Sequence, residues 1–354
     1  MLFVCDCQFS IAYGRPPVTV EDATIKNYEK FLEGPKVVNV PGDIRLSAQV
    51  ALFRVMTEAY QRFGTDMDQV LEDEDFTYLR RFNVAVEEWR LKWEKRSSKF
   101  KEMGLLFAML TRTTVNNPYI GSYPSLIIVL YYYFAKFQIN SLAFRGIGAL
   151  PNFSMNVERK EAANASIAAC LSTLTLITDE PDMRSALSSV PIFTHTMIAF
   201  SATFLLQVAA RWSNSNALSI DARHVLGHVS RVANLMDEVK FKVGETHLTR
   251  HIARGLKKLL DNFRILDDGD GSAMTKVEPV PHQGGTPVNG MHYVPPPPGF
   301  DGRIVEYPQY SGDGRSSFPA ENWPYMMNDV RGTYGFGFDE QLLNPFVSDS
   351  SSWY

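Results

Sequence analysis

The chain is 354 residues long, has a formal net charge of −4, and 45% of its residues are apolar, enough for a sizeable core. At about 150 residues per domain, this length predicts about two domains. The chain as a whole therefore lacks the excess of basic residues that is typical of a nucleic-acid-binding protein. The three cysteines exclude a disulfide-rich secreted scaffold and a multi-zinc module, because a closed zinc site needs four ligands.

The first residues lack the pattern of a secretory signal peptide. Asp6 interrupts the apolar run, no basic segment precedes it, and no small-residue cleavage site follows it. Met1 begins inside this run without a helix cap, so we expect the chain to be N-terminally truncated. Gly14, which can take the left-handed conformation, and the proline pair at 16–17 predict the end of a helix.

Composition divides the chain near residue 266. Residues 267–354 contain four basic and twelve acidic residues, a net charge of −8, whereas residues 1–266 carry +4. The last 88 residues also contain 12 of the 23 glycines and 11 of the 20 prolines. Such a segment cannot build a packed core, so we expect a disordered tail after a folded domain.

Apolar residues in the first 266 positions recur with the period of an α-helix. Amphipathic stripes predict helices over 43–64, 73–96, 219–240 and 246–266, and a short helix is expected over 22–32. The stripe in 73–96 consists of Phe76, Leu79, Phe82, Val86, Trp89 and Trp93. The pattern predicts a single large all-α domain of nine to ten helices.

Three further stretches, 122–145, 160–178 and 190–212, are apolar on nearly every side. Such a helix is either a buried core helix or a membrane span. The 21 residues from Val190 to Ala210 contain no acid, Lys or Arg, which is long enough to span a bilayer. Polar residues inside this stretch, among them His195 and Gln207, favour the core helix.

No common catalytic signature is present, whether a nucleophile elbow, a Walker loop, a zinc-protease motif or a dinucleotide fingerprint. Two histidine pairs, His224 with His228 and His247 with His251, have the four-residue spacing of one helix face. Each pair could bind a metal or could simply lie on a polar face, and we expect the polar face because no carboxylate completes either pair. The sequence thus predicts no enzyme, no metal and no cofactor in this chain.

Two strings carry a resemblance to a known family. The first string, residues 9–17, reads FSIAYGRPP, and the second string, residues 133–146, reads YFAKFQINSLAFRG. Both are similar to the middle homology region of fungal zinc binuclear cluster transcription factors, in the subgroup of secreted-protease activators and weak-acid-response regulators. The family motif residues in these strings are Tyr13, Gly14, Arg15, Pro16, Phe144, Arg145 and Gly146.

The resemblance implies a helical regulatory domain over residues 1–266 and a nuclear location. In this family zinc is held by an N-terminal cluster of six cysteines, which these residues do not contain, so DNA would be bound only through a module outside this chain. It also implies that the full-length factor forms a homodimer, and it implies no membrane association.

The acidic tail contains aromatic and leucine side chains among its acids, the composition of an activation domain that binds transcriptional coactivators. The expected anchors are Phe336, Phe338, Leu342, Leu343 and Phe346. The alternative for the tail is a plain disordered C-terminus.

The sequence therefore predicts the regulatory and activating portion of a fungal RNA polymerase II transcription factor. The alternative is a DNA-binding-deficient helical module that binds an effector or partner and competes with the full-length factor. An unrecognised all-α enzyme is a third, weaker alternative.

Overall fold

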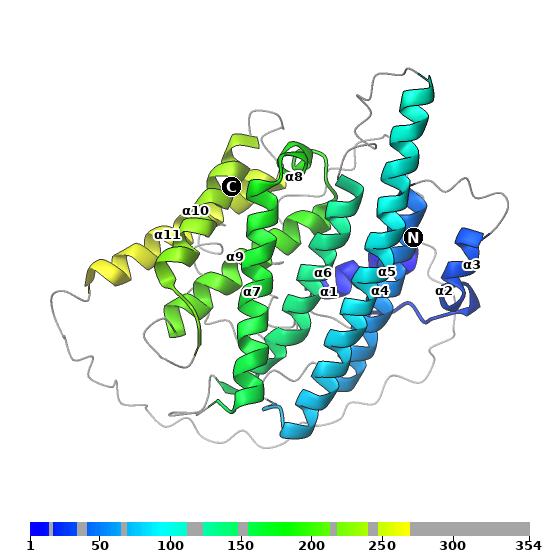
Figure 1. Cartoon of the computed structure of the whole chain (residues 1–354). Coiled ribbons are helices and arrows are strands. Elements are labelled where there is room, and N and C mark those ends of the chain that lie inside the picture. Colours follow the sequence, from blue (N-terminus) through cyan, green and yellow to red (C-terminus); the bar gives the residue numbers. More distant parts are fainter. Residues whose placement is uncertain are drawn as a thin grey trace, which may run out of the picture.

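Helix α9 (Ile192–Trp212) packs against α7, α10 and α11, while α4, α5 and α6 pack on one another, and α6 packs against α7 (Figure 1). The computed structural model describes residues 1–13, 17–33, 41–64, 69–111, 123–147, 155–212, 218–239 and 247–269. Every regular element in these ranges is a helix, which confirms the predicted all-α class. The elements are α1 Leu2–Tyr13, α2 Ala23–Lys26, α3 Tyr28–Glu33, α4 Pro41–Phe63, α5 Asp73–Thr111, α6 Tyr123–Ser141, the 3-10 helix η1 Leu142–Phe144, α7 Val157–Asp179, α8 Pro181–Ala186, α9 Ile192–Trp212, α10 Ala222–Val239 and α11 Leu248–Gly269.

The predicted stripes form the core faces of their helices. Trp93 in α5 is fully buried, and the indole N–H of Trp89 donates a 2.7 Å hydrogen bond to the carbonyl of Ala48 in α4. In the C-terminal pair, the valines of α10 are buried, as are Leu256, Leu259 and Leu260 of α11, and these two helices lie side by side (Figure 1). The 3.6-residue period therefore identified both the helices and their buried faces.

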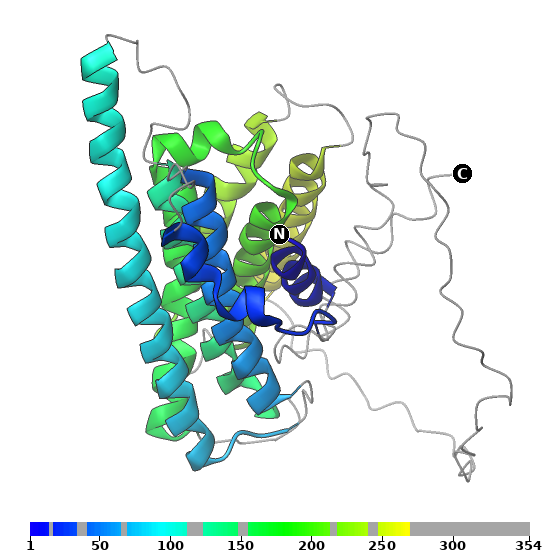
Figure 2. The same cartoon turned by 90° about the vertical axis from the view of Figure 1, so that its right-hand side faces the viewer.

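Two predicted boundaries were wrong. The helix predicted over 73–96 continues to Thr111, and Figure 2 shows its last turns extending beyond the other helices. Phe100, Met103, Phe107 and Leu110 continue the three- and four-residue spacing beyond Trp93, and most residues between them are good helix formers, so the helix continues past its predicted end. The short helix predicted over 22–32 is two helices, because the Asn27 side chain donates to the Ala23 carbonyl at 2.7 Å and ends α2.

Among the described helices, two are long and apolar enough to cross a membrane, at Ser125–Phe144 and Ile192–Trp212. Both are mostly buried inside the bundle, so the interpretation as core helices is confirmed over the membrane alternative. Ser201 of α9 is satisfied within its own helix, since its hydroxyl donates to the Met197 carbonyl at 2.9 Å. The His195 Nε2 atom lies 3.0 Å from the Leu187 carbonyl oxygen.

Helix α11 ends at Gly269, three residues past the predicted domain boundary at 266. The chain beyond it, including the predicted anchors of the tail, lies outside the described residues. The disordered tail and its activation segment therefore stay predictions.

Candidate functional site

The second string places a buried arginine against the end of helix α4. Arg145 directly follows η1 and is 1% exposed. Its guanidinium donates to the carbonyl of Phe63 at 2.7 Å and to that of Gly64 at 2.8 Å. These are carbonyls at the C-terminus of α4, where no intrahelical donor remains and where the helix dipole favours a cation. Arg145 thus serves as a side-chain cap for a helix that lies about eighty residues earlier in the chain.

A second buried arginine, Arg159, lies beside the first. It belongs to the first turn of α7, is 2% exposed, and donates to the carbonyls of Ala143 at 2.8 Å and Leu71 at 2.7 Å. Its guanidinium stands 5.3 Å from the ring centre of Phe76. Burial lowers the pKa of Arg159 from its ordinary value, and Asp73 opposes the shift. Guanidinium groups stay protonated in proteins, so Arg159 is a cation. We call Arg145 and Arg159 the arginine junction.

The arginine junction connects four segments through main-chain oxygens: the end of α4, the segment before α5, η1 and the start of α7. Guanidinium groups are permanent cations with a planar fork of donors, which suits them to hold backbone geometry. They supply neither a nucleophile nor a general base at neutral pH. The chemistry of the junction is therefore positional.

The remaining motif residues lie in the same region or in α1. The Phe144 ring packs edge-on against Phe204 of α9, with ring centres 5.5 Å apart. Gly146 has a φ of +69°, a conformation that glycine adopts without strain. Tyr13 is the last residue of α1, and residues 14–16 lie outside the described residues.

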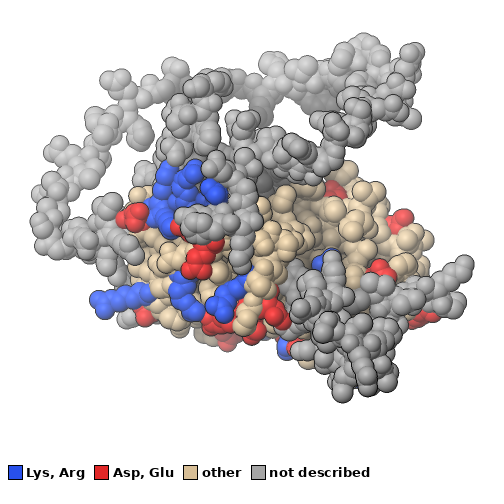
Figure 3. Space-filling view, turned by 90° about the horizontal axis from the view of Figure 1, so that it is seen from above, with Lys and Arg blue, Asp and Glu red and all other residues tan. Residues whose placement is uncertain are grey.

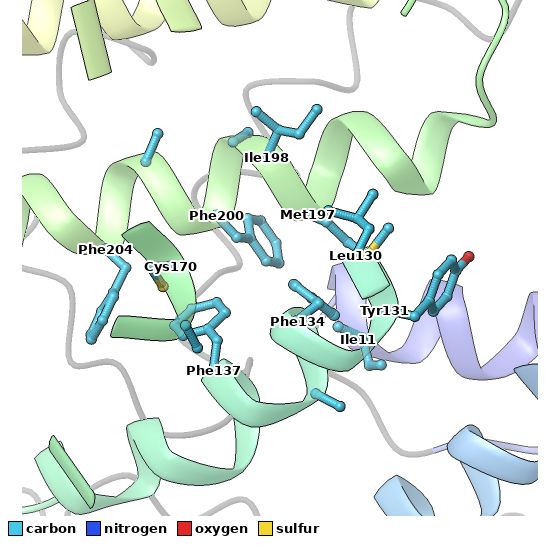
Figure 4. Close-up of a cluster of buried hydrophobic side chains, with 14 of the residues drawn as sticks. Ile11, Leu130, Tyr131, Phe134, Phe137, Cys170, Met197, Ile198, Phe200 and Phe204 are labelled. Atoms are coloured by element: carbon cyan, nitrogen blue, oxygen red, sulfur yellow. The ribbon is translucent and has the colours of Figure 1, made fainter. Parts of the chain in front are cut away.

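The helices that carry the two strings meet in the core. Ile11 of α1 and Phe134 of α6 are both buried, and Figure 4 shows them in one cluster with Leu130 and Tyr131. The Gln8 side-chain amide also donates to the Tyr131 hydroxyl at 3.0 Å. The structure therefore brings together two segments that the sequence analysis treated as separate signals.

One important residue of the first string's surroundings was missed. The Asp6 carboxylate accepts hydrogen bonds from the backbone N–H groups of Val18 at 2.8 Å and Thr19 at 2.7 Å. It thereby holds the chain that follows the first string against the second turn of α1. The sequence did indicate this role, because Asp6 is an acid within an otherwise apolar helix. An acid placed near the core needs a polar partner.

A pocket of about 190 Å³ opens beside the junction, between α5, α6 and α7. Its polar groups largely satisfy each other: Asn83 and Asn140 exchange amide hydrogen bonds of 2.9 and 2.8 Å, and Arg80 pairs with Glu158 at 3.2 Å. Lys136 also lines it, and burial lowers the pKa of this amine while Glu87 opposes the shift. No polar group of these pairs requires a ligand.

The histidines and cysteines of the described residues are distributed over several helices. No group of three or more His, Cys, Asp and Glu there could hold a metal ion. Burial raises the pKa of the Cys7 thiol to about 12 and that of Cys170 well above its ordinary range, so both are poor nucleophiles. His247 stacks edge-on to His195 with ring centres 5.6 Å apart, so the two predicted pairs lie in different surroundings.

The chain is similar to a fungal transcriptional activator, in agreement with the resemblance of the two strings. It is 45% identical over 349 residues, or 99% of its length, to the transcriptional activator of proteases prtT of Emericella nidulans. The alignment covers 47% of that protein, so the chain spans about half the length of the curated relative it matches. No family model matches the chain, and no solved structure does. The predicted resemblance to the secreted-protease activator subgroup is confirmed.

Proposed function

We propose that the chain is the regulatory and transcription-activating portion of a fungal RNA polymerase II transcription factor of the zinc cluster family. The observation that carries this proposal is the 45% identity along 99% of the chain to a transcriptional activator. The proposal does not require an enzyme activity, since the relative is named as an activator and the sequence has no catalytic signature.

The helical body would act as the regulatory part and the tail as the activating part. On the face in Figure 3, basic and acidic side chains lie near each other, which does not favour direct DNA binding through this face. Many are paired, as Arg90 is with Glu87 at 2.6 Å and Lys92 with Glu29 at 2.6 Å. DNA would be bound through a zinc cluster outside these residues, in a homodimeric factor located in the nucleus.

The tail would recruit coactivators through its aromatic and leucine anchors. In such interfaces a few buried side chains carry most of the binding energy, while charges mainly speed the encounter. The five expected anchors lie within eleven positions, from Phe336 to Phe346, with Asp339 and Glu340 among them. The acids would keep the anchors in water until a partner binds them.

A reporter assay tests this proposal with the full chain fused to a neutral DNA-binding domain. We expect activation, loss of most of it when all five anchors become alanine, and a smaller loss for Asp339→Asn with Glu340→Gln. A matched control, Tyr307→Ala with Tyr310→Ala, removes tail aromatics outside the predicted segment and should retain most activity. An intact fusion that is expressed but inactive would contradict the proposal and favour the competing-module alternative.

A further inference from the structure

Helix α10 places two imidazole rings side by side at the surface of the bundle. His224 is exposed and His228, one turn later, is half-buried, and their Nε2 atoms lie 3.1 Å apart. The ring centres are 4.5 Å apart and the planes are inclined by 80°. The spacing follows from the four-residue separation, which stacks side chains on one face of a helix.

A separation of 3.1 Å between two imidazole nitrogens is the separation that one metal ion requires. Zinc–imidazole bonds are about 2.0–2.1 Å long, so two ligands at an angle between octahedral and tetrahedral lie about 2.9–3.4 Å apart. From this agreement we propose that His224 and His228 form a two-histidine site for a late first-row divalent cation such as Zn²⁺, Ni²⁺ or Cu²⁺. The inference is independent of the proposed activation by the tail.

Charged groups of α7 and α10 lie near the histidine pair. Asp179, at the end of α7, bonds Arg231 one turn along α10, and its carboxylate adds a negative charge near the site.

The second histidine pair, on α11, does not have this geometry. His247 precedes the helix and acts as its cap, since its Nδ1 atom accepts the backbone N–H of Thr249 at 3.3 Å. Its ring also packs against His195 of α9. His251 is half-buried like His228 and belongs to the neighbouring helix, so it provides a matched control.

The site would be exchangeable rather than structural. Structural zinc sites have four protein ligands, whereas the described residues provide no group of three or more ligating side chains. Water would complete the coordination, and the ion could enter and leave without unfolding the bundle. Imidazole ligands favour Cu²⁺ over Ni²⁺ and Zn²⁺ and bind Mg²⁺ poorly, so the order of affinity is itself diagnostic.

Titration calorimetry of the full chain with Ni²⁺, and then with Zn²⁺, tests the proposal at pH 7.5. We expect saturable binding that His224→Gln and His228→Gln each weaken at least about 10-fold, as the loss of a ligand should exceed the loss of an outer-shell partner. His251→Gln should leave this binding unchanged, and Mg²⁺ should not compete. Helical circular dichroism of each variant would establish that it is folded.

Two results would overturn the proposal. Equal affinity in the wild-type chain and in both variants of the α10 pair would mean that the 3.1 Å contact is a proton shared between two rings. An equal loss in His251→Gln would assign the binding to histidines in general rather than to this pair. Copper bound to the wild-type chain should, in addition, show nitrogen ligands by electron paramagnetic resonance that disappear in the double variant.

Discussion

Replacing Arg145 by methionine should destabilise the helical body by about 2–3 kcal/mol. The substitution leaves the Phe63 carbonyl, in a buried position, without its 2.7 Å donor, at a cost of about 1–3 kcal/mol. The Gly64 carbonyl is only partly buried, so water can replace the guanidinium there and the loss is about 1 kcal/mol. A buried cation no longer has to be desolvated, which offsets part of the sum.

Urea unfolding followed by circular dichroism measures this loss as a change in the free energy of unfolding. The matched control is Arg80→Met, because Arg80 is 60% exposed in its pair with Glu158 and should contribute less than about 1 kcal/mol. Arg145→Lys keeps the charge but loses the planar fork that reaches two carbonyls. Its loss in the free energy of unfolding should therefore lie between those of Arg145→Met and Arg80→Met. A loss for Arg145→Met no larger than that for Arg80→Met would refute the capping argument.

Two further predictions concern polar groups in the core and near α1. Burial lowers the pKa of His195 to about 4 in the folded chain. As the pH falls, the unfolded chain therefore binds a proton at this residue before the folded chain does, and the free energy of unfolding should fall by up to about 3 kcal/mol between pH 6.5 and 4. Urea unfolding at both pH values should show a smaller pH dependence for His195→Gln. Asp6→Ala should cost about 1–2 kcal/mol in the same assay, since it removes the acceptor for Val18 and Thr19, and a loss comparable to that of an exposed acid would contradict this role.

The helices could be predicted because their stability depends on apolar faces, which have a period in the sequence. The last turns of α5, beyond Trp93, were not predicted. Phe100, Met103, Phe107 and Leu110 keep the three- and four-residue spacing of a helix there, so the sequence contained a signal that the prediction did not use. By contrast, one side-chain hydrogen bond of Asn27 divides a predicted helix in two, an effect too local for a periodic pattern.

The arginine junction could be predicted only in part. Arg145 belonged to a recognisable string, but its partners are 81 and 82 residues away, and nothing nearby indicates them. Arg159 was missed because it follows Val157 and Glu158 in a charged first turn that resembles a solvent-exposed face. A guanidinium can be buried only where other segments supply carbonyl oxygens to it. Main-chain carbonyls belong to every residue type, so the sequence does not reveal which of them will be partners.

The contacts of Arg145 also explain why the residues around it, and not the residues it contacts, carry the resemblance to the family. Its guanidinium binds main-chain oxygens, and any residue type supplies the same oxygen. The residue types that matter are therefore Arg145, which is the donor, and the residues of the turn that orients it. Gly146 completes this turn with its φ of +69°. The side chains of Phe63 and Leu71 are buried in the core, and the junction uses only their main-chain oxygens. A substitution at Arg145 should thus be far more damaging than one at the exposed positions of the segments it holds.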